Sequence, residues 1–235
     1  HAKFGEIEIL PLTRIQKISG PFLHRNWATI PHVTQFDEAD ITDLEAYRQS
    51  LKEEYRAQGT RLTLFPFILK AVTHALERFP QFNVSLRGDD ETVLWKKYFH
   101  IGVAVDSPNG LQVPVIQDVD SKSVSALARE LTDLSERARE GKLNSKDMQG
   151  GCFTISSLGA IGGTAFTPIV NAPEVAILGV SKSEMKPVWN GKEFIPRLAL
   201  PLALSYDHRA VNGADAARFV DQIGKVMTDI RKLLL

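Results

Sequence analysis

The segment from Leu64 to Phe79 is apolar on nearly every side when it is read as a helix, and this stretch constrains the fold more than any other. A helix without a polar face has to be covered all round by protein. The chain has 235 residues, and a chain of this size buries roughly 70–75% of the surface of its unfolded form. Because no linker, repeat or low-complexity tract interrupts residues 1–235, we expect a single domain built around this helix.

Strand-like patterns fill much of the remaining chain. Short runs of β-branched and aromatic residues are separated by turn sequences, and Asn190-Gly191 is typical of a tight hairpin. The turns at 87–90 and 107–110 are expected to close two further hairpins. The strand-like segments are 32–39, 83–86, 92–95, 100–105, 111–117, 152–157, 175–181 and 198–206.

Two helical patterns precede these strands or lie among them. The first begins near Pro11, and Gly20-Pro21 should kink or restart it. Thr42 and Glu45 form a capping-box pattern, which predicts a helix from Thr42 to about residue 58. Since Gly59 follows directly, we expect this helix to end there.

Two more helices are predicted in the second half of the chain. One runs from about 123 to 140 and stops at Gly141, and the other begins near Asn212-Gly213. The expected apolar face of the last helix comprises Ala217, Val220, Ile223, Met227, Ile230 and Leu234. These elements together favour an α+β domain with a mostly antiparallel or mixed sheet covered by helices.

Composition excludes several classes of partner. Lysine plus arginine and aspartate plus glutamate number 28 each, so we expect no nucleic-acid partner. Cys152 is the only cysteine, which excludes an internal disulfide, and no Cys/His cluster predicts a metal site. No secretory signal is visible, and no apolar stretch approaches the roughly 20 residues of a membrane helix. We therefore expect no membrane partner.

A polar cluster around His208 is the sharpest candidate for chemistry. It lies between the end of a strand and the start of a helix, where functional residues are often placed. Histidine has a pKa of ~6.5, so His208 could take a proton near neutral pH. Taken alone, a structural interpretation is the more common one, with Asp207 and Asn212 as turn and cap residues. Asp207 is also an unsuitable acid partner, because adjacent side chains seldom point at each other.

A second candidate is the strand that runs into Ser156, Ser157 and a glycine-rich turn at 159–163. The turn lacks the Gly-Lys-Ser/Thr of a phosphate loop. It also lacks the G-x-S-x-G of a serine hydrolase, so taken alone it is best interpreted as a strand and a tight loop. Structural roles are the more common expectation for His24, His32, His74 and His100, and Cys152 should be a small buried hydrophobic residue.

Taken together, these features resemble a known family. The stretches DHRAVNGADAARF at 207–219, FTISSLGAIGGTAFTPIVNAPEVAILGVSK at 153–182 and LTRIQKISGPFLHRNWATIPHVTQFDEADIT at 12–42 resemble blocks of the 2-oxoacid dehydrogenase acyltransferases, in order and across almost the whole chain. Chloramphenicol acetyltransferases resemble them more distantly. The resemblance implies a chloramphenicol-acetyltransferase-like fold, with a mixed sheet covered by helices and the active site between subunits of a trimer.

The resemblance also implies roles for three residues. His208 matches the catalytic base of the family, and Ser156 matches the hydroxyl that stabilises the tetrahedral intermediate. Asn212 matches an aspartate or asparagine four residues after the histidine. Most members carry aspartate there, whereas this chain has an uncharged asparagine, so an ionic role at this position is excluded in this chain. Gly20-Pro21 also departs from the family's ordinary helix formers.

The implied reaction is acyl transfer between dihydrolipoamide and coenzyme A, without a metal. The lipoamide would be carried on a separate lipoyl domain. That domain and a peripheral-subunit-binding domain are absent from residues 1–235 and are expected N-terminal to His1. The residues after Asn212-Gly213 resemble the acetyl-transferring, pyruvate-complex branch. The alternatives are a succinyl- or branched-chain acyl-transferring member, a non-catalytic scaffold core, and an acetyltransferase that acts on a small hydroxyl substrate.

The resemblance further implies partners and a location. Homotrimers are expected to assemble into a cubic or icosahedral core, and the full-length protein would bind pyruvate dehydrogenase and dihydrolipoamide dehydrogenase subunits. The expected location is the cytoplasm of a bacterium, or the mitochondrial matrix in a eukaryote. The chain ends in Leu233, Leu234 and Leu235, and such an apolar terminus predicts contact with a partner surface.

Overall fold

The computed structural model describes residues 1–88, 91–107 and 110–234. Its main element is a mixed seven-stranded sheet with the order β1-β11-β9-β8-β4-β7, in which β10 pairs with β11 outside this path. Strand β8 is parallel to β4 and to β9, and the other pairs are antiparallel. Its strands are β1 (His32–Asp40), β4 (Ile101–Val103), β7 (Val115–Ile116), β8 (Phe153–Ser157), β9 (Ala176–Val180), β10 (Glu184–Trp189) and β11 (Phe194–Asp207).

Two small hairpins stand beside this sheet. One pairs β2 (Val84–Leu86) with β3 (Val93–Trp95), and the other pairs β5 (Val105–Ser107) with β6 (Gly110–Gln112). The described strands therefore agree with the two predicted hairpins, although residues 89–90 and 108–109 of their turns lie outside the described residues. The α-helices are α1 (Arg14–Thr29), α2 (Thr42–Ser50), α3 (Lys52–Ala57), α4 (Phe65–Arg78), α5 (Val124–Arg139) and α6 (Gly213–Thr228). Short 3-10 helices are η1 (Ala2–Phe4), η2 (Pro80–Phe82), η3 (Ser145–Met148) and η4 (Ile230–Leu234).

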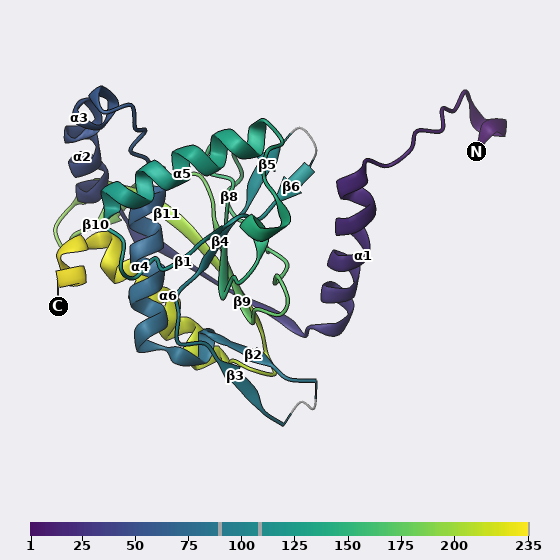
Figure 1. Cartoon of the computed structure of the whole chain (residues 1–235). Coiled ribbons are helices and arrows are strands. Elements are labelled where there is room, and N and C mark those ends of the chain that lie inside the picture. The colour runs from purple at the N-terminus through teal and green to yellow at the C-terminus, as the bar shows by residue number, and fades with distance from the viewer. Residues whose placement is uncertain (89–90, 108–109, 235) are drawn as a thin grey trace.

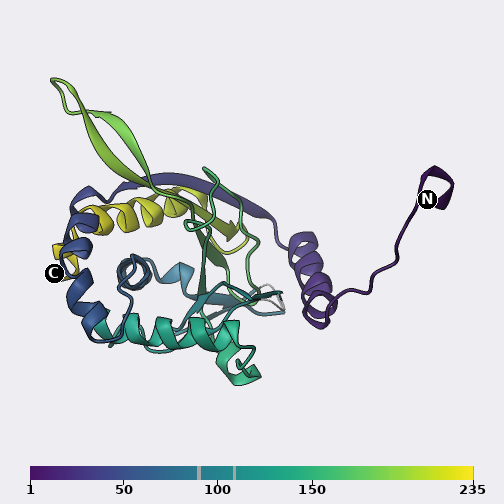
Figure 2. The ribbon, with the colours of Figure 1, turned by 90° about the horizontal axis from the view of Figure 1, so that it is seen from above.

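The predicted apolar helix is confirmed as the centre of the core. Helix α4 lies between α5 and α6, and all three lie on one face of the curved sheet (Figures 1 and 2). Leu69, Ala71, Val72 and Ala75 on α4 have no exposed surface. Neighbouring elements cover most of the helix, and solvent reaches mainly the partly buried Phe65 at its start and the polar side chains of Lys70, His74, Glu77 and Arg78.

Alternation along the strands separates this core from the opposite face of the sheet. In β8, Phe153 and Ile155 belong to the main core beneath the helices, so Thr154 and Ser156 point to the other side. In β9, Leu178 belongs to the main core, whereas Ile177 joins a small separate cluster. The sheet thus has one apolar face under the helices and one face that carries polar side chains.

The helix after β1 begins at Thr42 as predicted, but the predicted capping box is wrong. Thr42 is the first helical residue and not the cap, and its hydroxyl donates to Asp40 Oδ1 at 2.6 Å. The Thr42 hydroxyl also accepts from the Leu198 amide at 2.8 Å, which ties the helix start to β11. The predicted single helix is also divided at Leu51 into α2 and α3. A hydrogen bond between the helix start and β11 has therefore taken the place of the predicted capping box.

The first helix differs from its prediction as well. Helix α1 is continuous through Gly20 and Pro21, so it does not restart there. It lies on the side of the sheet away from α4, α5 and α6 (Figure 2). Ile18 is 65% exposed and Trp27 is 61% exposed. The helix was predicted correctly from the spacing of its apolar residues, but the described residues leave Ile18 and Trp27 uncovered.

Three residues of the predicted apolar face of the last helix, Ala217, Ile230 and Leu234, do not belong to that face. On α6 the buried alanine is Ala216, whereas Ala217 is exposed. The helix ends at Thr228, so Ile230 belongs to η4, where Leu234 is 85% exposed and Leu233 packs partly against the core. Leu235 lies outside the described residues.

Two predicted strands are also shorter than expected. The segment 100–105 divides into β4 and β5, and 111–117 divides into β6 and β7. Pro114 lies in the second break, and its ring nitrogen has no proton to donate to a ladder. The Asn190-Gly191 hairpin is confirmed: Gly191 has a φ of +98°, and the β10–β11 hairpin projects from the body (Figure 2, light green).

Candidate active site

His208 lies in the turn directly after β11. Its backbone amide donates to the Pro31 carbonyl at 3.1 Å, which fixes the turn to the start of β1. Its ring lies 5.8 Å from the ring of the buried Tyr206, and the side chain is otherwise exposed. The imidazole is therefore held by its backbone and one neighbouring ring while it remains accessible to a substrate.

Asp207 and Arg209 enclose His208 on both sides in the sequence. Asp207 is buried, and its Oδ1 accepts from the Arg209 backbone amide and Nε, both at 3.0 Å. Its Oδ2 accepts from Arg209 Nη2 at 2.7 Å. The expectation that Asp207 is not the acid partner of His208 is confirmed, because both carboxylate oxygens are directed at the guanidinium.

Asn212 caps the helix that follows this turn. Its Oδ1 accepts from the Asp215 amide at 2.9 Å, and its Nδ2 donates to Asp215 Oδ2 at 2.8 Å. Both ends of the amide are thus engaged within the first turn of α6. The structure places Asn212 at the same end of the sheet as His208, in the cap position that the structural interpretation gave it.

Ser156 lies in a row of residues that crosses four strands. Cross-strand partners share a face, so the row Phe36, Ala203, Gly179 and Ser156 faces away from the main helices. The Phe166 ring covers Gly179 so closely that a Cβ there would lie 2.9 Å from it. Ser157 points to the opposite face, and its hydroxyl accepts from the Gly159 amide at 3.4 Å.

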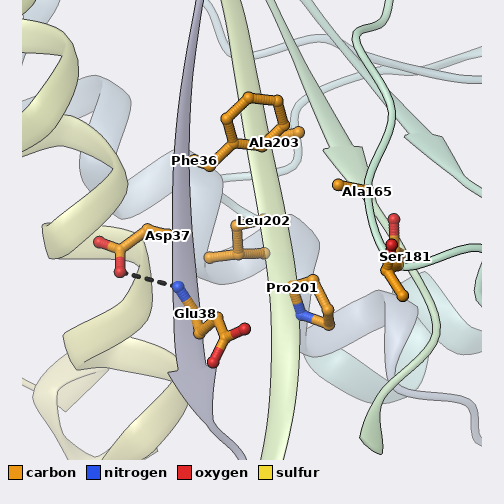
Figure 3. A pocket seen from close by; sticks show the side chains of 9 residues that line it. Phe36, Asp37, Glu38, Ala165, Ser181, Pro201, Leu202 and Ala203 are labelled. Carbon is orange, nitrogen blue, oxygen red and sulfur yellow. Dashed lines mark hydrogen bonds between the residues drawn. The ribbon is translucent and has the colours of Figure 1, made fainter.

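An open cavity of about 400 Å³ begins in this row, two strands from Ser156. Its floor is apolar, and its edge carries hydroxyls and the Glu38 carboxylate, whereas the Asp37 side chain points to the other side of β1 (Figure 3). The Asp37 carboxylate accepts from the Glu38 amide at 2.7 Å, and the Glu38 carboxylate pairs with Lys186 of the projecting hairpin. The lining residues are Phe36, Asp37, Glu38, Thr164, Ala165, Ser181, Pro201, Leu202 and Ala203. This cavity could not be predicted from the sequence, since its lining comes from four separate segments.

Ser156 and His208 of one chain are far apart. Ser156 is two strands from Ala203, or about 10 Å, because neighbouring strands are about 4.8 Å apart. His208 follows five residues after Ala203, which adds about 16 Å along β11 at about 3.3 Å per residue. The resulting separation of about 15–20 Å exceeds the combined reach of the two side chains. One chain therefore cannot bring Ser156 and His208 to the same reacting atom.

The remaining histidines have mixed surroundings. His32 has a structural role, since its Nδ1 contacts the Ile30 carbonyl and its Nε2 accepts from the Val170 amide, both at 2.9 Å. His100 Nδ1 accepts from the Asp118 amide at 3.0 Å. His74 differs from expectation: its Nε2 is buried without a partner among the described residues, and burial lowers its pKa. His24 is exposed on α1.

Cys152 is fully buried, and burial raises the pKa of its thiol to about 12, so it is the small buried residue that the sequence predicts. Within residues 1–88, 91–107 and 110–234, no three His, Cys, Asp or Glu side chains gather as metal ligands would. None of the described helices is both long and apolar enough to cross a membrane.

The fold is that of the chloramphenicol acetyltransferases. A solved chloramphenicol acetyltransferase superimposes with a TM-score of 0.56 at 16% identity, over 87% of this chain and 94% of that one. The family can be stated more closely. A sequence model of the 2-oxoacid dehydrogenases acyltransferase (catalytic domain) matches residues 4–235, and the chain belongs to this family.

Similar proteins share much more sequence. The dihydrolipoyllysine-residue acetyltransferase component of the pyruvate dehydrogenase complex of Haemophilus influenzae is 61% identical over 236 residues, covering all of this chain but 42% of the relative. The chain thus spans less than half the length of that relative. Two solved structures each have a TM-score of 0.98 and 58% identity, over 100% of this chain and 96% of theirs. One is an Azotobacter vinelandii dihydrolipoamide acetyltransferase studied for the catalytic role of a serine, a histidine and an asparagine. The other is the cubic core of the pyruvate dehydrogenase multienzyme complex.

Proposed function

We propose that this chain is the catalytic core of a dihydrolipoamide acetyltransferase, which transfers an acetyl group between dihydrolipoamide and coenzyme A. One observation carries the proposal. Ser156, His208 and Asn212 are separated by the same intervals as the serine, histidine and asparagine studied in the Azotobacter vinelandii enzyme. The 2-oxoacid dehydrogenase acyltransferase family and the 61% identical relative support the same activity.

The proposed chemistry follows from the properties of a thiol. A thiol of pKa ~8.5 is mostly protonated at neutral pH, whereas the thiolate is the nucleophile. His208 takes the proton of coenzyme A as the sulfur attacks the thioester carbon of acetyl-dihydrolipoamide. Negative charge develops on the carbonyl oxygen, and the Ser156 hydroxyl donates a hydrogen bond to it. When the intermediate collapses, the proton returns to the leaving dihydrolipoyl sulfur, so no covalent enzyme intermediate forms.

The proposed active unit contains more than one chain. A separation of about 15–20 Å between Ser156 and His208 within one chain requires a second copy to complete the site. We propose a homotrimer in which Ser156 of one subunit faces His208 of the next. The exposed apolar residues of α1 offer a surface for such contacts, with Ile18 65% exposed and Trp27 61% exposed. The similarity to a cubic core supports further assembly of trimers into a cubic or icosahedral particle.

The proposed substrates arrive as thiol-bearing arms. The open cavity beside the Ser156 row has an apolar floor and hydroxyls at its edge, which suits the chain of dihydrolipoamide or the pantetheine arm of coenzyme A. In the full-length protein, lipoyl domains would carry the lipoamide, and pyruvate dehydrogenase and dihydrolipoamide dehydrogenase subunits would be bound to the same assembly. By the same resemblance, we propose a cytoplasmic location in a bacterium or a mitochondrial matrix location in a eukaryote.

The test compares acceptors and acyl groups. The assembled core is supplied with acetyl-, succinyl- and isobutyryl-coenzyme A, each with dihydrolipoamide or with a hydroxyl acceptor such as chloramphenicol. Because transfer to a dithiol leaves the total number of thiols unchanged, free coenzyme A is separated from dihydrolipoamide by reversed-phase chromatography and quantified directly. The expected result is fast transfer of acetyl to dihydrolipoamide alone. A preference for another acyl group would correct the substrate, transfer to chloramphenicol would change the class of acceptor, and no transfer by folded particles would indicate a scaffold.

A further inference from the structure

A buried carboxyl group lies on the polar face of the sheet, outside the proposed chemistry. Glu174 is 5% exposed and precedes β9. Its Oε2 accepts from the Thr154 hydroxyl at 2.6 Å, and its Oε1 accepts from Asn171 Nδ2 at 3.3 Å. Burial raises the pKa of Glu174 to about 7. A buried carboxyl group lowers the stability of the fold when it ionises, so Glu174 is not explained by a contribution to stability.

The backbone around Glu174 is shaped to accept it. A Cβ on Gly151 would lie 2.8 Å from Glu174 Oε1, and a Cβ on Gly102 would lie 2.8 Å from the Thr154 hydroxyl. Both neighbouring positions therefore need glycine for the Thr154–Glu174 pair to fit. The pair is enclosed by backbone on two sides and has little freedom to shift.

This pair connects the two halves of the proposed site. Thr154 is two residues before Ser156 on β8, so both side chains point to the same face. Val175, which follows Glu174, accepts a hydrogen bond at its carbonyl from the Asp207 amide at 2.8 Å. Asp207 in turn precedes His208. Glu174 thus joins the strand that carries Ser156 to the turn that carries His208 within one chain.

We propose that Glu174 is a positioning residue that sets the place of the His208 turn relative to β8. The proposal rests on the proposed function, in which His208 is the base. Because His208 of one subunit serves the site shared with the next, a displaced turn would misplace the base relative to the neighbour's serine. Misplacement of a reacting group by about 1 Å can cost about 100-fold in rate.

The charged surroundings of Glu174 are few. Lys96 favours its ionised form from a distance, and the Lys96 ammonium donates to the Val84 carbonyl at 3.1 Å. The Cys152 thiol faces the same region and stays protonated near neutral pH, since its pKa is about 12. Among the described contacts, neither the Lys96 ammonium nor the Cys152 thiol touches Ser156 or His208. An effect of Glu174 on turnover therefore has to come from a shift of the backbone.

The experiment uses the assembled core and four variants. Glu174→Ala and Thr154→Val remove the link. Glu174→Gln keeps the size of the side chain, and Thr154→Ser keeps the hydroxyl that donates to Glu174. We expect the first two to lower kcat by about 10- to 100-fold with KM for coenzyme A changed less than about twofold. The two conservative variants should retain most of the activity. Melting temperature and particle mass show which variants are folded, and Thr154→Val provides the answer if Glu174→Ala does not fold.

A double variant separates this proposal from the proposed function. If Glu174 acts through His208, adding Glu174→Ala to His208→Ala should lower the residual rate by less than about twofold. A full additional loss would overturn the positioning role, as would wild-type kcat in folded Glu174→Ala and Thr154→Val. Wild-type turnover in His208→Ala would instead contradict the proposed function, so the failure of one proposal can be told from the failure of the other.

Discussion

Asp207 and Arg209 form a two-pronged ion pair across the turn that presents His208, with Oδ1 to Nε at 3.0 Å and Oδ2 to Nη2 at 2.7 Å. The carboxylate is buried and the guanidinium is partly exposed. The two side chains on either side of the histidine therefore hold each other and leave its ring free. The orientation of the imidazole depends on this pair and on the Pro31 carbonyl, and not on a carboxylate at its own ring.

Arg209→Lys should loosen this turn. A lysine keeps the charge but cannot offer two parallel donors to the carboxylate. We expect the free energy of unfolding to fall by about 1.5 kcal/mol, the lower end of the range for a hydrogen bond to a charged group, because Arg209 is partly exposed. The kcat should fall about tenfold with an unchanged particle mass. Urea unfolding and chromatographic measurement of free coenzyme A give the two quantities. Unchanged values of both would show that the hydrogen bond from Arg209 Nη2 to Asp207 Oδ2 contributes nothing.

His208→Ala should remove the proposed base. The side chain is exposed, so the fold should be retained, with a melting temperature close to that of the unaltered protein. We expect kcat to fall by about 10²–10⁴, the usual effect of removing a general acid–base group. The assay is steady-state transfer from acetyl-coenzyme A to dihydrolipoamide. Near-normal turnover would exclude His208 as the base.

Ser156→Ala and Ser157→Ala form a matched pair, because the two hydroxyls point to opposite faces of β8. Ser156 shares its face with Gly179 and Ala203, whereas Ser157 contacts the Gly159 amide. We expect Ser156→Ala to lower kcat by about 10²–10³ with little change in KM. Ser157→Ala should stay within about threefold of the original rate. The opposite order would place the oxyanion donor on the helix side of the sheet.

Mixed assemblies should regain activity. Ser156→Ala chains and His208→Ala chains are each expected to be inactive, but a mixed trimer contains interfaces with an intact Ser156 opposite an intact His208. Random association of equal amounts gives about one intact interface in four. We therefore expect up to about a quarter of the original rate after joint dissociation and reassembly. If proven mixed trimers stay inactive, both groups must act within one chain.

Glu174→Gln should change how stability depends on pH. The pKa of Glu174 rises from 4.5 to about 7 on folding, so its favourable contribution is present below pH ~4.5 and is lost as the pH rises through ~7. Glutamine does not titrate. The free energy of unfolding of the variant relative to the original protein should increase by about 3 kcal/mol between pH 4.5 and pH 8. Urea unfolding at fixed protein concentration measures this difference, and Glu193→Gln on the exposed hairpin is the control. Parallel curves for both proteins would contradict the buried titration.

The positions of the central helix and of the main strands along the chain could be predicted because those patterns depend on burial, which is periodic along the chain. Prediction failed at Thr42, where a capping pattern was displaced by a contact with Leu198, 156 positions away. It also failed on α6, where the buried residue is Ala216 and not its neighbour Ala217. Local rules alone cannot describe contacts between segments that meet only in the folded chain.

The candidate site shows the same limit. His208 and Ser156 stood out by their residue types and flanking patterns. Glu174 did not, since a glutamate before an apolar strand gives no sign that Gly102 and Gly151 make room for a buried carboxyl pair. The cavity lining was also invisible, because its residues come from distant segments. Both features depend on the register between strands that are distant in the sequence, and local sequence patterns do not reveal that register.

Strand β11 spans 14 residues and carries both the cavity floor and, at its end, the turn with His208. It is paired with β1 on one edge and with β9 and β10 on the other. A single-residue insertion or deletion between Ala203 and Asp207 would turn every later side chain to the opposite face of the sheet. Only two-residue changes would keep the faces, and each would move His208 by about 6.6 Å. The number of residues between Ala203 and His208 therefore cannot change one residue at a time during evolution without loss of the site.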